Sequence, residues 1–201
     1  MSPRLAEHIA CVPPSGIRKF FDIVSEMKDA ISLGVGEPDF VTPWAYSDAA
    51  IYSMRAGHTH YTSNWGLIEL RRAINEYQRE RFGLEYRPEN EILVTVGASE
   101  GIDLALRAVL EPGDEVIIPT PAFGLYEALV QLQGGVPVSL PTEHNHFQIV
   151  PEELKAAITD RTKAIILTSP NNPTGVVYSR QTLEGLAELL RRKSTQFGHS
   201  I

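Results

Sequence analysis

Residues 92–119 read ILVTVGASEGIDLALRAVLEPGDEVIIP, an apolar run, a stretch of helical periodicity and a second apolar run. We predict strands at Ile92–Val96 and at 115–119, with a helix from about Ser99 to Leu110 between them. The alternation continues with strands at Val136–Leu140 and 163–169, and with helices from about Phe123 to Leu132, Pro151 to Ile158 and Gln181 to Arg192. Strands that are apolar throughout and separated by helices indicate a mostly parallel sheet with helices on both faces. The predicted fold class is therefore α/β.

The residues on either side of this pattern are organised differently. The first 40 or so residues contain several prolines and one amphipathic stretch, in which apolar side chains fall at helical spacing between Ile17 and Met27. Helices are predicted at 43–56 and 67–82. The end of the chain, KSTQFGHSI at 193–201, is polar and without periodicity. We therefore divide the chain into an N-terminal arm (1–42), a main domain (43–192) and an off-pattern tail (193–201).

The composition excludes several classes of partner. Acidic residues outnumber basic ones by 25 to 18, the net charge is -7, and no block of Lys and Arg occurs. These features argue against binding to nucleic acid or to an anionic membrane. The single cysteine, Cys11, has no partner for an internal disulfide, and MSPRLAEHIACVPP at the N-terminus contains no apolar segment that would serve as a signal peptide or membrane span. We expect small-molecule or protein partners and a cytoplasmic location.

Ligands of a parallel sheet bind beyond the carboxyl ends of its strands, so the residues that follow each strand are the informative ones. After the first predicted strand, Gly97 permits a tight turn, and the backbone N–H groups of Ala98 and Ser99 then begin a helix. The helix dipole favours an anion at this position, and phosphate is the obvious candidate. The alternative is that Ser99 is an ordinary N-cap of a structural helix.

Two further predicted strand ends carry residues suited to binding a flat, polar ligand. After the second strand, PTPAFGLYE would bring the ring of Phe123 to the sheet edge, where it either stacks on a ligand or packs under a loop. After the fourth strand, SPNNPTG holds Asn172 directly before a proline, which restricts its backbone. Its amide is then placed to donate to a ligand oxygen, although Asn-Pro is also a common turn former.

Metal binding is not predicted from this sequence. His58 and His60 lie two residues apart, but no carboxylate or cysteine pattern accompanies them.

Five stretches together resemble one enzyme family: LGVGEPDF (33–40), HYTSNWGLIELRRAI (60–74), VTVGASEGIDLAL (94–106), PGDEVIIPTPAF (112–123) and SPNNPTGVVY (169–178). The chain is similar to the amino-terminal half of the fold-type I enzymes that depend on pyridoxal 5'-phosphate (PLP), within the class I/II aminotransferases related to aspartate aminotransferase. The resemblance covers roughly residues 15–192. It implies an incomplete large domain at 43–192, and an arm with part of the small domain at 1–42.

The resemblance also implies how the cofactor is bound. Ala98 and Ser99 would supply backbone N–H groups to its phosphate. Phe123 would stack on the pyridine ring, where the family uses an aromatic residue, and Asn172 would donate to the phenolic oxygen.

Two further positions match family residues with other roles. Tyr61 matches a tyrosine that reaches across a homodimer interface to the cofactor phosphate of the neighbouring subunit. Gly36 matches a glycine whose backbone N–H meets the substrate carboxylate. The implied activity is transfer of an amino group between an α-amino acid and a 2-oxo acid.

No catalytic residue is assigned, because the family's Schiff-base lysine, from a motif like Ser-x-x-Lys, is not found. The lysines are Lys19, Lys28, Lys155, Lys163 and Lys193, and none follows a predicted strand in such a context. We therefore interpret the chain as a truncated form, by frameshift, premature stop or cloning boundary, and expect it alone to be inactive. Two alternatives stay open: a non-catalytic fragment or dimer partner of a full-length aminotransferase, and a parent that is a C–S lyase or cyclopropane-forming synthase of the same fold.

Overall fold

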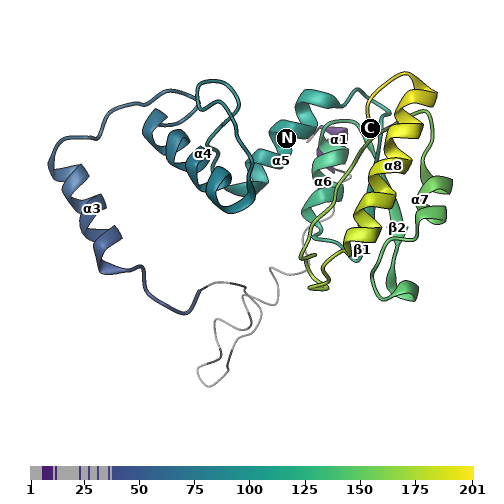
Figure 1. The fold of residues 1–201 in the computed structure, drawn as a ribbon, viewed down its shortest axis with the longest axis horizontal. Coiled ribbons are helices and arrows are strands. Elements are labelled where there is room, and N and C mark those ends of the chain that lie inside the picture. The colour runs from purple at the N-terminus through teal and green to yellow at the C-terminus, as the bar shows by residue number, and fades with distance from the viewer. Residues whose placement is uncertain are drawn as a thin grey trace, which may run out of the picture. The chain divides into compact units, whose positions relative to one another are not determined.

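The computed structural model describes residues 6–10, 12, 23, 27, 31, 36 and 38–201. The chain divides into two compact units, one containing residues 97–201 together with the first fifteen residues, and the other containing residues 16–96. Figure 1 shows the helices and strands of both units, coloured along the chain. The amphipathic stretch predicted between Ile17 and Met27 lies almost entirely outside the described residues. The domain boundaries proposed at 42/43 and 192/193 remain predictions.

The larger unit is built on a parallel sheet, as predicted. Its strands are β1 (Glu115–Thr120), β2 (Val136–Pro141) and β3 (Thr162–Ile165), in the order β2-β1-β3. Ile117 of β1 lies opposite Val138 of β2 on one side and Ile165 of β3 on the other. The central strand, β1, is therefore a neighbour of β3 in the sheet, although β2 lies between them in the sequence.

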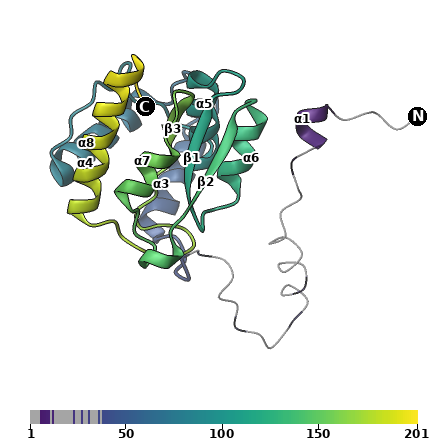
Figure 2. The same cartoon turned by 90° about the vertical axis from the view of Figure 1, so that its right-hand side faces the viewer.

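Helices cover both faces of this sheet (Figure 2). They are α5 (Gly97–Val109), α6 (Leu125–Leu132), α7 (Pro151–Ala157) and α8 (Arg180–Phe197), with the 3-10 turn η1 (Glu143–Asn145) after β2 and the short helix α1 (Glu7–Ala10) near the N-terminus. Successive side chains of a strand point to opposite faces. Accordingly Val116 and Ile118 pack with residues of α5 and α6, whereas Ile117 packs with residues of α7 and α8. This two-sided burial explains why the three consecutive residues Val116, Ile117 and Ile118 of β1 are all apolar.

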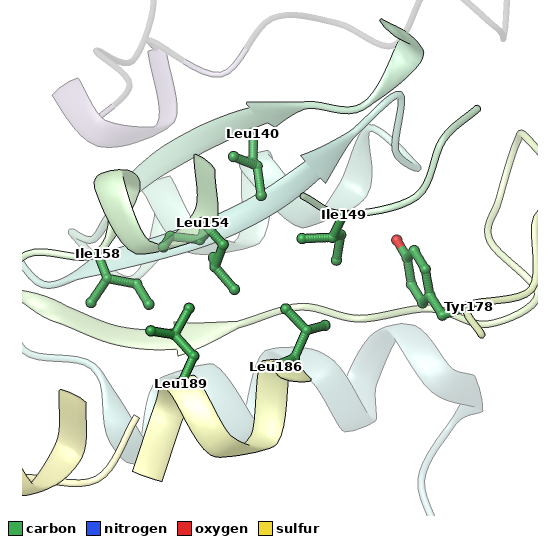
Figure 3. Close-up of a cluster of buried hydrophobic side chains, with 8 residues drawn as sticks. Leu140, Ile149, Leu154, Ile158, Tyr178, Leu186 and Leu189 are labelled. Carbon is green, nitrogen blue, oxygen red and sulfur yellow. The ribbon is translucent and has the colours of Figure 1, made fainter. Parts of the chain in front are cut away.

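The core on the α7 and α8 side is a cluster of eight buried residues (Figure 3). Its members are Ile117, Leu140, Ile149, Leu154, Ile158, Tyr178, Leu186 and Leu189. Leu154 has no exposed surface, and Leu186 and Leu189 of α8 face it from across the cluster. Burial of a Leu side chain contributes about 1.5–3 kcal/mol, so this cluster is what fixes both helices to the sheet.

Helix α8 extends beyond the helix predicted at 181–192. It begins after Ser179, whose hydroxyl accepts from the Thr182 backbone N–H at 3.0 Å, and continues through Phe197 to a left-handed Gly198. Phe197 and Ile201 pack against the buried cluster of Figure 3. Residues 193–197, which we had separated from the domain as an off-pattern tail, therefore continue the last helix.

The predicted strand Ile92–Val96 is wrong, because these residues adopt no regular structure. A parallel strand forms only beside a hydrogen-bonded neighbour. Residues 92–96 belong to the unit of residues 16–96, which contains no strand within its described part. The N–H of Val94 instead donates to the Trp65 carbonyl at 3.1 Å. The fourth predicted strand, 163–169, is also shorter than expected, since β3 ends at Ile165.

The smaller unit contains the two helices predicted there, α3 (Trp44–Arg55) and α4 (Ile68–Phe82). A close approach between the turn before α4 and residues 92–95 holds this unit together. Gly66 has φ +92°, and a Cβ built on it would lie 2.7 Å from Val94 Cβ. Arg71 of α4 is 6% exposed and donates to the carbonyls of Pro88 and Glu89.

In the part of the chain that the structure describes, no helix is long and apolar enough to cross a membrane.

Candidate functional site

The carboxyl edge of the sheet gathers two loops that are distant in sequence. The β1 exit loop, residues 121–124, follows the central strand, and the β3 exit loop, residues 166–179, follows its neighbour. Because parallel strands end at the same edge, both loops lie on the side of the sheet where ligands of such folds bind. Of the six residues predicted to form the site, Phe123 and Asn172 lie on these loops.

Phe123 is presented by the β1 exit loop with part of its ring accessible. The peptide bond between Thr120 and Pro121 is cis, and Phe123 comes two residues later, just before α6. Its ring contacts the ring of Tyr126 edge-on, with centroids 5.9 Å apart and planes at 85°. The Phe123 side chain remains 37% exposed, whereas Tyr126 is 7% exposed. A flat ligand therefore has access to Phe123, and the buried Tyr126 limits how the ring is oriented.

The β3 exit loop is held by hydrogen bonds of the side chain and the backbone of Asn171. The peptide bonds before Pro170 and Pro173 are cis. Asn171 Nδ2 donates to Thr174 Oγ1 at 2.9 Å, and its backbone N–H donates to the Val176 carbonyl at 2.9 Å. Asn172, the next residue, is exposed. Asn171 therefore stabilises the loop, whereas the side chain of Asn172 is accessible to solvent.

The beginning of α5 supplies the third part of the site. A helix of thirteen residues is about 20 Å long, and so is a strand of six residues. Only residues 110–114 connect α5 to β1, so α5 runs antiparallel to the strand and begins near the edge where the strand ends. Gly97, at φ +77°, makes the turn into the helix, and Ala98 and Ser99 are exposed in its first turn. The N–H groups of a first helical turn have no partners within the helix, which suits them to an anion.

Gly36 and Tyr61 belong to the other compact unit, which contains residues 16–96. Tyr61 lies in the connection between α3 and α4 and is fully exposed. It lines a hollow of about 550 Å³ together with Ser53, His58, His60 and Glu69, among others. Gly36 is exposed, and a Cβ added to it would meet no atom within 4 Å. Their predicted roles remain predictions.

The described lysines all lie away from the carboxyl edge or have other partners. Lys163 is in the first half of β3, at the opposite edge of the sheet from the exit loops. Lys155 of α7 pairs with Glu152 at 3.4 Å, and Lys193 of α8 lies 5.2 Å from the centroid of the Phe197 ring. Within the described residues, no group of three or more His, Cys, Asp or Glu side chains is arranged to hold a metal ion.

Sequence reasoning missed the residues that connect the β3 exit loop to the β1 exit loop and to the first turn of α6. Asn171 Nδ2 also donates to the Pro121 carbonyl at 3.1 Å, and the hydroxyls of Tyr126 and Thr168 share a hydrogen bond of 3.0 Å. An Asn-Pro turn needs only Asn172, so the additional asparagine at 171 was a signal that its side chain has another contact. No comparable signal marked the contact of Tyr126 with Thr168.

Comparison with known proteins identifies the family. The family model for class I and II aminotransferases matches residues 28–196. The chain is 47% identical to the aspartate aminotransferase of Pyrococcus abyssi, over 92% of the chain and 48% of the relative. It is 40% identical to aromatic-amino-acid aminotransferase 2 of Thermococcus litoralis, over 92% of the chain and 48% of the relative. The fold matches the structure of Thermus thermophilus aspartate aminotransferase with maleate, with a TM-score of 0.86 and 37% identity, over 98% of the chain and 52% of that structure.

The chain belongs to the class I and II aminotransferase family. It spans about half the length of the relatives that it matches. The resemblance found in the sequence motifs is thus confirmed over 28–196, and so is the α/β fold with a parallel sheet.

Proposed function

We propose that the chain provides the cofactor-positioning half of a PLP-dependent aminotransferase, which moves an amino group between an α-amino acid and a 2-oxo acid. The observation that carries this proposal is the arrangement at one edge of the sheet. Phe123 follows β1 and Asn172 follows β3 at that edge, and the first turn of α5 begins near it. All three are accessible. Family membership supplies the reaction class.

The three elements suit the three chemical parts of pyridoxal 5'-phosphate. Backbone N–H groups of Ala98 and Ser99 would receive the phosphate, which the helix dipole also favours. The accessible face of Phe123 would cover the aromatic ring, and the amide of Asn172 would donate to the phenolic oxygen. When bound, the cofactor supplies an electron sink for chemistry at the amino acid α-carbon. The protein residues orient it and exclude water from one face of its ring.

The complete active site needs residues beyond these. Nothing about the described lysines fits a covalent role at this edge, because Lys163 lies in the first half of β3 and Lys155 is paired on α7. We therefore propose that these 201 residues alone bind the cofactor without turning over substrate. Tyr61 would serve the cofactor phosphate of a partner subunit in a cytoplasmic homodimer, and Gly36 would meet the substrate carboxylate.

Binding of pyridoxamine 5'-phosphate tests this proposal, because this form of the cofactor requires no covalent attachment. We expect saturable binding, measured by fluorescence titration, that weakens about three- to tenfold in Phe123→Leu. Phe82→Leu is the matched control: Phe82 also contacts a tyrosine edge-on, with the Tyr77 centroid at 6.0 Å and the planes at 71°, but it lies in the other unit.

The same titration on Asn172→Ala probes the phenolic oxygen contact, and we expect a similar loss. Absence of saturable binding by the unmodified chain would refute the proposal. Equal weakening by Phe123→Leu and Phe82→Leu would also count against it, because the effect would then not come from the sheet edge.

A further inference from the structure

The two exit loops at the sheet edge are joined by one side chain that has no predicted role, that of Asn171. It is partly buried, and its Nδ2 donates both to the Pro121 carbonyl at 3.1 Å and to Thr174 Oγ1 at 2.9 Å. The first bond leaves its own loop and reaches the β1 exit loop, fifty positions earlier in the sequence. The second bond fixes the orientation of the amide within its own loop.

The backbone of Asn171 is anchored on both sides. Its N–H donates to the Val176 carbonyl at 2.9 Å, and its carbonyl accepts from the Gly175 N–H at 2.7 Å. Because the backbone of Asn171 is fixed by two hydrogen bonds, its side chain has few conformations and cannot move independently of the loop. A shift of the Pro121 carbonyl would therefore have to move the β3 exit loop as well.

The segment that carries Phe123 is held at both of its ends by the β3 exit loop. Pro121, two residues before Phe123, is bound by Asn171, and Tyr126, three residues after it, shares a hydroxyl hydrogen bond of 3.0 Å with Thr168. Asn172 is the residue next to Asn171 on the same loop. The Asn171 amide thus lies on the shortest hydrogen-bonded route between Phe123 and Asn172.

We propose that Asn171 is a positioning residue, which sets the placement of the Phe123 ring relative to the Asn172 amide without itself touching the cofactor. Its importance for cofactor binding rests on the proposed function, in which Phe123 covers the cofactor ring and Asn172 binds the phenolic oxygen. The placement itself is a property of the chain without ligand. The two adjacent asparagines therefore have different roles: Asn171 holds the two exit loops together, and Asn172 contacts the ligand.

Asn171→Asp is the sharpest perturbation, because it keeps the shape and replaces the donor by a carboxylate oxygen that repels the Pro121 carbonyl. Asn145→Asp is the matched control, since Asn145 is also partly buried and its Nδ2 also donates to a backbone carbonyl, that of Gln148 at 3.3 Å. Asn171→His restores a ring N–H near the position of Nδ2 and tests for rescue.

The first measurement uses the chain without ligand. We expect the NMR resonances of the Phe123 ring and the Asn172 side-chain amide to shift in Asn171→Asp, while those of residues in β1 and β3 stay in place. Asn145→Asp should leave Phe123 and Asn172 unchanged, and Asn171→His should return them toward their original positions. Unchanged resonances of Phe123 and Asn172 in Asn171→Asp would overturn the inference, whatever the chain binds.

The second measurement uses pyridoxamine 5'-phosphate. In the unmodified chain, a donor on the phenolic oxygen should lower the pH at which that hydroxyl of the bound ligand ionises. We expect Asn171→Asp to bind about three- to tenfold more weakly, with ionisation returned toward the pH of the free ligand. Normal binding and ionisation in Asn171→Asp would overturn the inference even though the proposed function stands. If the unmodified chain fails to bind pyridoxamine 5'-phosphate, the proposed function is refuted. The NMR comparison alone then tests whether Asn171 positions Phe123 relative to Asn172.

Discussion

Replacement of Gly66 by alanine tests the packing of the smaller unit. Gly66 has φ +92°, a conformation that side chains rarely adopt, and an added Cβ would lie 2.7 Å from both Cβ and Cγ2 of Val94. The backbone strain costs about 1–2 kcal/mol. The overlap adds about 1–3 kcal/mol, because Cβ of a β-branched residue cannot rotate away. We therefore expect Gly66→Ala to lower the free energy of unfolding of this unit by about 2–5 kcal/mol.

Gly83→Ala separates the two contributions. Gly83 also has a positive φ, +67°, but an added Cβ there would meet nothing within 4 Å. Its replacement should cost only the backbone strain, about 1–2 kcal/mol, because the effect of alanine on the unfolded chain is the same at both positions. Combining Gly66→Ala with Val94→Gly removes the overlapping atoms, so in that background the cost of Gly66→Ala should fall to the level of Gly83→Ala.

Urea unfolding measured by tryptophan fluorescence is the assay. The chain has two tryptophans, Trp44 and Trp65, and both belong to the unit of residues 16–96. In a Trp44→Phe background, the signal reports on Trp65 alone, directly beside the substitution. The reasoning is refuted if Gly66→Ala costs no more than Gly83→Ala, or if Val94→Gly leaves the cost of Gly66→Ala unchanged.

Three further predictions concern the larger unit. Leu154→Ala should cost about 2–5 kcal/mol in urea unfolding, because Leu154 is wholly buried, whereas Leu183→Ala, at a residue 41% exposed, should cost well under half of that. Burial raises the pKa of the Tyr178 hydroxyl, so the neutral side chain contributes its full stability below pH about 10. This contribution is lost as the pH rises through the folded-state pKa. Tyr178→Phe should therefore make the melting temperature fall less steeply over that alkaline range. Arg161 Nη2 donates at 2.6 Å to Glu115, whose side chain is 7% exposed, so Arg161→Met should cost about 1–3 kcal/mol, and a double-mutant cycle with Glu115→Gln should show that most of this cost is coupling.

Much of the larger unit could be predicted because its signals are local. Apolar runs such as 115–119 mark buried strands, and the ends of α5 and α7 were predicted to within two residues. Ile92–Val96 carries the same apolar signal but lacks a neighbouring strand among the described residues, and strand formation depends on that neighbour. The extension of α8 was missed because polar residues separate Leu190 from Phe197, although both pack against the same core.

The candidate site was predicted residue by residue but not as a connected structure. Phe123 and Asn172 follow predicted strands, and that rule alone places them at the carboxyl edge. The contact of Asn171 with Pro121 depends on β3 lying next to β1, with β2 on the other side. Strand order is set by packing of the whole sheet, so no local pattern around Asn171 could have shown which loop it would reach.

The order of the strands also has a consequence for how the chain folds. The contacts of the β3 exit loop with the β1 exit loop and with α6 span 50 residues for Asn171 and Pro121, and 42 for Tyr126 and Thr168, so they raise the contact order of the unit. We expect such contacts to form late, because closing the intervening chain costs entropy and because they require β3 to have docked. A ligand that binds across these loops would therefore stabilise only the state in which β3 has docked beside β1, and its binding would report that docking.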